Sequence, residues 1–163
     1  MGGRASNRSH GHPSLGRAIG PACAALMAGA ILSGCVGPAR SYGAYEGKAG
    51  ATADQMVSAV ETARLAALVA TRHDGFAPYL SVTIAEAEQD ADSIQGAFDS
   101  IQPPDHRSDA LRDQLDRLLS QATDTISSMR IAGRRSDFAE VERLAESLTP
   151  LSDRLDAFAQ AHA

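Results

Sequence analysis

The stretch that decides the fold is "LSVTIAEAEQDADSIQGAFDSI", residues 80–101. Its apolar residues recur at intervals of 4, 3, 4, 3, 4 and 3. They are Leu80, Ile84, Ala87, Ala91, Ile94, Phe98 and Ile101. Because an α-helix repeats every 3.6 residues, this spacing places all of them on one helix face. We therefore predict an amphipathic helix that starts near Pro78 and ends at Pro103-Pro104.

The segment before this stretch and the two segments after it show the same helical period. Each of the three predicts at least one helix. The first starts at Thr52, with Gln55 completing a capping box, and stops at Gly75. Its stripe comprises Met56, Val57, Val60, Ala63, Ala67, Leu68 and Ala70, whereas Leu65 and Val69 fall outside it. The next starts at Asp105 or Ser108 and stops at Gly133. Its inward residues are Leu111, Leu115, Leu118, Leu119, Ala122, Ile126 and Met129.

The last segment starts at Ser136 or Asp137 and contains Pro150. Its predicted buried residues are Phe138, Val141, Leu144, Leu148, Leu151, Leu155 and Phe158. Since the stripe continues past the proline, we favour one kinked helix over two separate helices.

Together these segments predict an all-α domain over residues 52–163, an antiparallel up-down-up-down four-helix bundle. Gly96 is expected to mark a close helix crossing. On the third helix, we expect surface ion pairs between Asp109 and Arg112, Arg112 and Asp116, and Asp113 and Arg117.

Residues 1–34 have the composition of a secretory leader. Arg4, Arg8 and Arg17 form a basic region, and an apolar run at residues 18–32 is too short to span a bilayer comfortably. The run ends in Leu32-Ser33-Gly34-Cys35, which resembles the lipobox of bacterial lipoproteins. That resemblance implies cleavage before Cys35 and its modification with a diacylglyceryl group, often with a further acyl chain such as palmitate. The alternative is an ordinary secretory signal followed by an incidental cysteine.

Residues 35–51 are then a lipidated cysteine and a flexible tether, because Gly, Ala and Pro dominate without a hydrophobic period. Tyr42 and Tyr45 within it would rest at the lipid interface or simply be exposed. The mature chain would carry a net charge of −8, since three of the 15 basic residues and none of the 20 acidic ones lie in the leader. Such a charge makes nucleic-acid binding an unexpected role.

The sequence predicts no catalytic residue, no metal and no cofactor. The Glu-x-x-His spacing of di-iron bundles and the G-x-S-x-G elbow of hydrolases are both missing, and His73 with Asp74 belongs to a turn. Met56 and His162 would sit at one end of the bundle, which makes them weak haem candidates. Glu88, Asp90, Asp92 and Asp99 match four EF-hand positions and are weak calcium candidates. The apolar seam of residues 80–101 continues through these positions, however, so the segment is predicted to be helical. This favours a solvated acidic face over a calcium-binding loop.

The segment "SIQPPDHRSDALRDQLDRLL", residues 100–119, resembles the small lipoproteins of high-GC bacteria that pair a lipobox with a helical bundle. This resemblance implies no activity. Our expectation is a non-enzymatic, extracytoplasmic bundle anchored to the cell membrane, which binds another envelope protein through a helix face. The alternative is a bundle that carries a metal, haem or small apolar ligand in its core.

Overall fold

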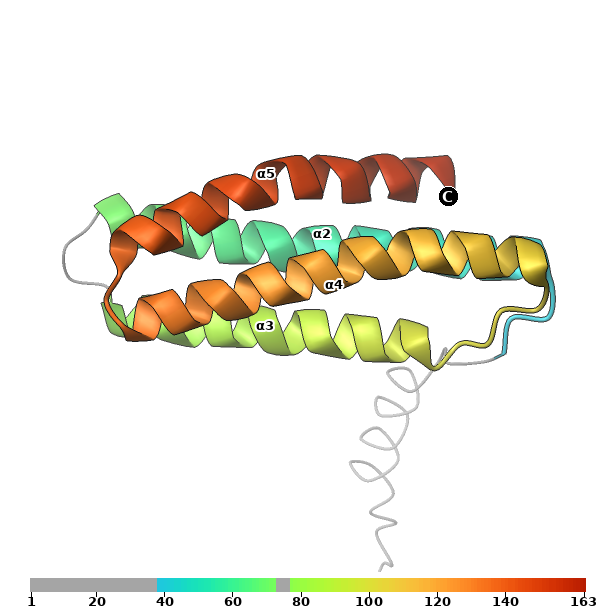
Figure 1. The fold of residues 1–163 in the computed structure, drawn as a ribbon, viewed down its shortest axis with the longest axis horizontal. Coiled ribbons are helices and arrows are strands. Elements are labelled where there is room, and N and C mark those ends of the chain that lie inside the picture. Colours follow the sequence, from blue (N-terminus) through green and yellow to red (C-terminus); the bar gives the residue numbers. More distant parts are fainter. Residues whose placement is uncertain (1–37, 73–76) are drawn as a thin grey trace, which may run out of the picture. The chain divides into compact units, whose positions relative to one another are not determined.

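The computed structural model describes residues 38–72 and 77–163. Four helices account for most of these residues, and no strand occurs among them. They are α2 (Tyr42–Arg72), α3 (Ala77–Asp99), α4 (His106–Arg134) and α5 (Phe138–Ala161), as Figure 1 shows. The predicted all-α class with four helices is therefore confirmed.

Contacts between the helices give their relative directions. Glu46, near the start of α2, lies beside His162, which follows α5, so these two helices run antiparallel. Helices α3 and α4 are also antiparallel, because Asp99 at the end of α3 pairs with Arg112 near the start of α4, whereas Glu88 in the middle of α3 pairs with Arg130 near the end of α4. In Figure 1 the α3–α4 connection lies at one end of the bundle and the α4–α5 connection at the other.

The core is built mostly from the predicted apolar stripes, with Tyr45 as an addition from the predicted tether. Its largest fully buried side chains are Tyr45, Met56, Leu80, Ile84, Phe98, Leu115, Leu119, Ile126, Met129, Leu148, Leu151 and Leu155. Burying a side chain of this size contributes about 1.5–3 kcal/mol. The seam of α3 is buried as predicted, except that Ile94 is only partly covered.

Helix α4 begins where the sequence predicts but ends differently. Asp105 caps it and accepts a hydrogen bond from the backbone N–H of Ser108 at 2.8 Å. At the other end the helix continues past Gly133 to Arg134. Ser136, with φ of 56°, takes the left-handed position that glycine usually occupies. The N–H groups of Ser136 and Asp137 bond the carbonyls of Gly133 and Ala132, which closes the helix end.

Helix α5 is capped by Asp137 and is continuous through Pro150, as predicted. Figure 1 shows it bending along its length. Pro150 is exposed while its neighbour Leu151 is buried, so the proline ring lies on the outer face and the apolar stripe is preserved. Phe138 is an exception to the predicted stripe, because it is 37% exposed at the start of the helix.

The predicted start of the first helix at Thr52 is wrong. Helix α2 begins ten residues earlier, at Tyr42, where the side chain of Ser41 accepts a hydrogen bond from the N–H of Ala44. Thr52 lies inside the helix, and its hydroxyl bonds the carbonyl of Lys48. Tertiary burial explains the difference: the core covers one face of this glycine-rich segment, which has little helix propensity of its own. Most of the predicted tether is therefore helical.

The prediction for Gly96 is also wrong. Gly96 is exposed, and a Cβ placed there would meet no heavy atom within 4 Å. The close approach occurs at Gly50 instead. A Cβ at Gly50 would lie 2.9 Å from the carbonyl carbon of His162 and 3.4 Å from the carbonyl oxygen of Ala159. The lack of a side chain at Gly50 lets α2 and α5 pack closely.

Candidate functional site

The exposed large hydrophobic side chains of the described residues gather at one end of the bundle. They are Leu65, Leu68, Val82, Ile131 and Phe138. The two leucines lie in the last third of α2, Val82 lies in the second turn of α3, and the other two flank the α4–α5 turn. In Figure 1 this end lies opposite the start of α2. Of the five, only Leu65 and Leu68 line the same groove, which makes that groove the candidate interaction surface.

Leu65 and Leu68 line a groove between α2 and α5, with a volume of about 280 Å³. They are 61% and 45% exposed, respectively. Ala67 from α2 and Ala145 from α5 also line the groove, and their small side chains leave room between the two helices. The groove therefore offers apolar contacts to a side chain inserted from outside.

Three carboxylates line this groove, and only that of Glu61 forms an ion pair with a described residue. Arg64 donates to both carboxylate oxygens of Glu61, at 2.6 and 2.8 Å, and the Ser152 hydroxyl donates to Glu61 at 2.7 Å. Partial burial raises the pKa of Glu61, but these hydrogen bonds outweigh it and leave the pKa below its ordinary value. Glu142 and Glu146, one turn apart on α5, form no ion pair with any described residue. The rim is therefore net negative.

The weak calcium candidates lie on α3, as the continuous seam predicts. Glu88 pairs with Arg130 across the α3–α4 interface, and Asp99 lies 3.6 Å from an arginine of α4. Asp90 and Asp92 are exposed. A continuous helix does not provide the turn geometry of an EF-hand loop. Across residues 38–72 and 77–163, no three His, Cys, Asp or Glu side chains are placed to hold a metal ion.

The weak haem candidates are explained by packing. Met56 is fully buried in the core. The Nδ1 atom of His162 lies 3.0 Å from Oε1 of Glu46, and its ring packs against Phe158 with centroids 4.4 Å apart. The hydrogen bond from His162 lowers the pKa of Glu46. These contacts join α2 to the end of α5 and give no support to a haem site.

The core contains two buried polar atoms that the sequence did not predict. Tyr45 is fully buried instead of lying at an interface, and its ring packs on Phe98 with centroids 5.7 Å apart. Tyr45 Oη and Asp116 Oδ1 are the buried side-chain atoms of the described residues that lack a hydrogen-bond partner. Burial raises the pKa of Tyr45 to about 12 and also raises the pKa of Asp116. The other oxygen of Asp116 lies 3.4 Å from Nε of Arg112.

The remaining predicted site residues lie outside the described part of the chain. They are Cys35, the cleavage motif at residues 32–34, and the turn residues His73 and Asp74. Within the described ranges, no helix has both the length and the hydrophobicity needed to cross a bilayer.

The α2–α5 groove was not predictable from the helical period. One available signal was Leu65, an apolar residue outside the predicted stripe of its helix. Leu68 gave the opposite signal, because it falls on the stripe and was expected to be buried. Which stripe residues α5 covers depends on how the two helices pack, and this is not encoded in the period of either one.

Comparison with known proteins adds no further constraint. No family model matches the chain, and no curated protein or solved structure proves similar to it.

Proposed function

We propose that this protein is a non-enzymatic, lipid-anchored bundle on the extracytoplasmic face of the membrane, which binds another envelope protein. The observation that carries the proposal is the α2–α5 groove, where Leu65 and Leu68 are exposed beside two small alanines. An apolar centre with a charged rim is typical of protein docking sites. The groove lining contains neither histidine nor cysteine, so its chemistry suits binding better than proton transfer or nucleophilic attack.

The charge of the rim specifies the chemistry of the partner. Glu142 and Glu146 repel each other weakly at this helical spacing and gain no compensating ion pair among the described residues. A helix with apolar side chains flanked by Lys or Arg would cover the leucines and neutralise these carboxylates. A second copy of this acidic chain and an anionic membrane surface both carry the wrong charge for the site.

The location of the groove suits an anchored protein. Cys35 precedes Ser41 by six residues, so a lipid on Cys35 would hold the start of α2 within about 20 Å of the membrane. Helix α2 has 31 residues. At a rise of 1.5 Å per residue it is about 45 Å long, and Leu65 and Leu68 lie in its far part. An anchored bundle would therefore present the groove away from the bilayer, toward other envelope proteins.

The anchor is tested by feeding expressing cells with an alkyne analogue of palmitate. We expect label in the membrane-bound wild-type protein and in Cys23→Ala, which lacks the other cysteine of the chain. Cys35→Ala should carry no label and should leave the membrane fraction. Label that persists in Cys35→Ala would refute lipidation at this residue.

The groove is tested by placing a photo-crosslinking amino acid at Leu65, with Gln89 on the exposed face of α3 as the control position. We expect one recurrent protein to crosslink from position 65 and not from position 89. The yield should fall at least fivefold in Glu146→Lys and stay unchanged in Asp92→Lys, which makes the same charge change away from the groove. Equal yields in the two variants, or no recurrent partner, would contradict docking in this groove.

A further inference from the structure

A second groove lies between α4 and α5, on the half of the bundle that contains the start of α2. Its volume is about 480 Å³, which falls within the range of roughly 300–1,000 Å³ typical of small-molecule sites. Leu118, Phe158 and Ala161 supply apolar lining, and Arg117, Arg154 and Gln121 supply polar lining. No acidic residue lines this groove. The chain has more acidic than basic residues, yet this groove is lined by two arginines and no carboxylate.

Arg117 has no carboxylate partner among the described residues. The expected pair with Asp113, one turn earlier on α4, is not formed. The neighbouring expected pair does form, because Nε of Arg112 lies 3.4 Å from Asp116. Arg117 is exposed beside the groove and forms no ion pair with a described residue.

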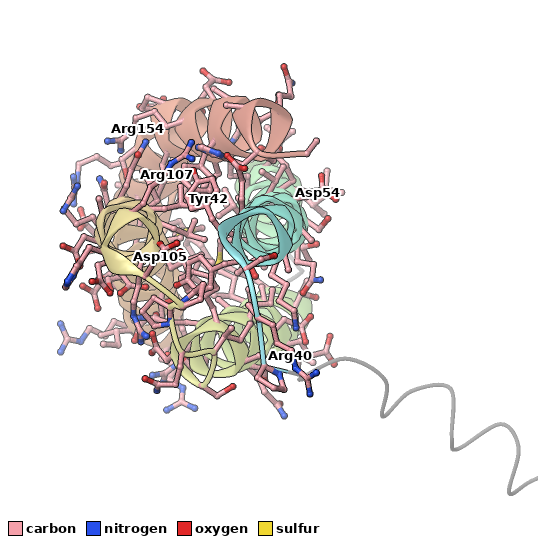
Figure 2. All side chains as sticks on the ribbon, turned by 90° about the vertical axis from the view of Figure 1, so that its right-hand side faces the viewer. Arg40, Tyr42, Asp54, Asp105, Arg107 and Arg154 are labelled. Atoms are coloured by element: carbon pink, nitrogen blue, oxygen red, sulfur yellow. The ribbon has the colours of Figure 1, made fainter. Side chains whose placement is uncertain are left out.

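Arg154 is positioned at the same groove by neutral partners only. Its Nη2 donates to Oε1 of Gln121 across the groove at 2.8 Å, and its Nε donates to the carbonyl of Pro150 at 3.3 Å. Figure 2 shows Arg154 on α5, on the side that faces α4. The carboxylate two residues further on, Asp156, accepts a hydrogen bond from Gln160 at 2.8 Å. Two cationic side chains thus line one groove with no anion paired to either of them.

We propose that this groove binds an anionic amphiphile, a molecule with a carboxylate or phosphate head and an alkyl chain. The guanidinium groups of Arg117 and Arg154 would bind the head, because a guanidinium fork matches the oxygens of both anions. The alkyl chain would follow the apolar lining toward Ala161, a distance of about 10 Å along α5 at 1.5 Å per residue. The ligand is either a free fatty acid or a membrane phospholipid, which share this chemistry. This site lies apart from the α2–α5 groove and does not depend on protein docking there.

The test uses membranes from cells that express the full chain. Isolated membranes receive a photoreactive dodecanoate, the same chain ending in an ammonium group, or phosphatidylglycerol with the photoreactive group on its acyl chain. After irradiation, cleavage at glutamates releases a peptide of residues 147–163, which contains the α5 side of the groove. This peptide also separates the site from any probe attached at Cys35.

We expect the dodecanoate or the phosphatidylglycerol probe to label residues 147–163 at least fivefold more than the ammonium probe. Labelling should fall at least fivefold in Arg117→Gln/Arg154→Gln and stay unchanged in Arg134→Gln/Arg135→Gln, which also removes two positive charges, at the end of α4 and outside the groove. Labelling by dodecanoate alone would identify a free fatty acid as the ligand, and labelling by the phospholipid would identify a membrane lipid. Equal labelling by the anionic and ammonium probes would overturn the proposal. Labelling that is unchanged in the double variant, with its circular dichroism matching the wild type, would overturn it as well.

Discussion

Gly50 lies where the backbones of α2 and α5 approach each other, and replacing it with alanine tests this packing directly. The new Cβ would be 2.9 Å from the carbonyl carbon of His162 and closer still to its oxygen. Either the two helices separate, or the end of α5 detaches and loses the contacts of His162 with Phe158 and Glu46. Overpacking of this kind costs about 1–3 kcal/mol. Alanine also favours the helix by about 1 kcal/mol relative to glycine, which partly offsets that cost.

A matched control separates the steric cost of the new Cβ from the gain in helix propensity. Gly47 lies in the same helix, and a Cβ placed there would meet no heavy atom within 4 Å. We therefore expect Gly47→Ala to raise the free energy of unfolding, and Gly50→Ala to be less stable than Gly47→Ala by about 1–3 kcal/mol. At about 4 °C per kcal/mol for a domain of this size, the melting temperatures should differ by roughly 4–12 °C. Amide hydrogen exchange should also quicken in the last turn of α5 in Gly50→Ala alone. Equal stabilisation by both substitutions would refute the close packing at Gly50.

Two further predictions concern polar groups of the bundle. Tyr45→Phe should raise the free energy of unfolding by about 1–2 kcal/mol, because it removes a buried hydroxyl that has no partner and keeps the ring against Phe98; a loss of stability in urea unfolding would instead show that the hydroxyl is satisfied. Glu88→Gln should lower the free energy of unfolding at pH 7 by about 1–3 kcal/mol, because Arg130 loses its carboxylate partner between α3 and α4. Burial raises the pKa of Glu88, but the hydrogen bonds from Arg130 and Ser127 outweigh it and hold the pKa below its ordinary value. The ion pair therefore stabilises the fold above the unfolded-state pKa and is lost as pH falls through the lower folded-state value, so unfolding measured from pH 7 to pH 3 should show the two proteins converging; a constant difference would contradict this assignment.

The periodic parts of the chain were predictable from sequence. The seam of α3, the caps Asp105 and Asp137, and the passage of α5 through Pro150 all follow from local rules of spacing and hydrogen bonding. These features depend on residues a few positions apart. For that reason they are encoded in short stretches of sequence.

The first ten residues of α2 were not predictable in the same way. Residues 42–51 contain three glycines and no clear stripe, and they are helical because Tyr45 and Ala49 are buried against the rest of the bundle. Their local composition predicts a flexible tether, since the contacts that stabilise the helix come from residues distant in the sequence. The close approach at Gly50 was missed for the same reason, because its neighbour His162 lies at the far end of the chain.

The candidate sites divide along the same line. A lipobox is a contiguous motif, so the sequence alone supports the expectation that Cys35 is lipidated. Each groove, in contrast, is lined by residues from two different helices that lie many positions apart in the sequence, such as Leu65 with Glu146 and Arg117 with Arg154. Helical period determines which residues share one face of one helix, whereas the rotation and crossing of packed helices determine which faces meet and which side chains remain exposed. The sequence by itself therefore determined the periodic helices and most of their stripes, whereas only the tertiary structure decided the start of α2 and which side chains line the two grooves.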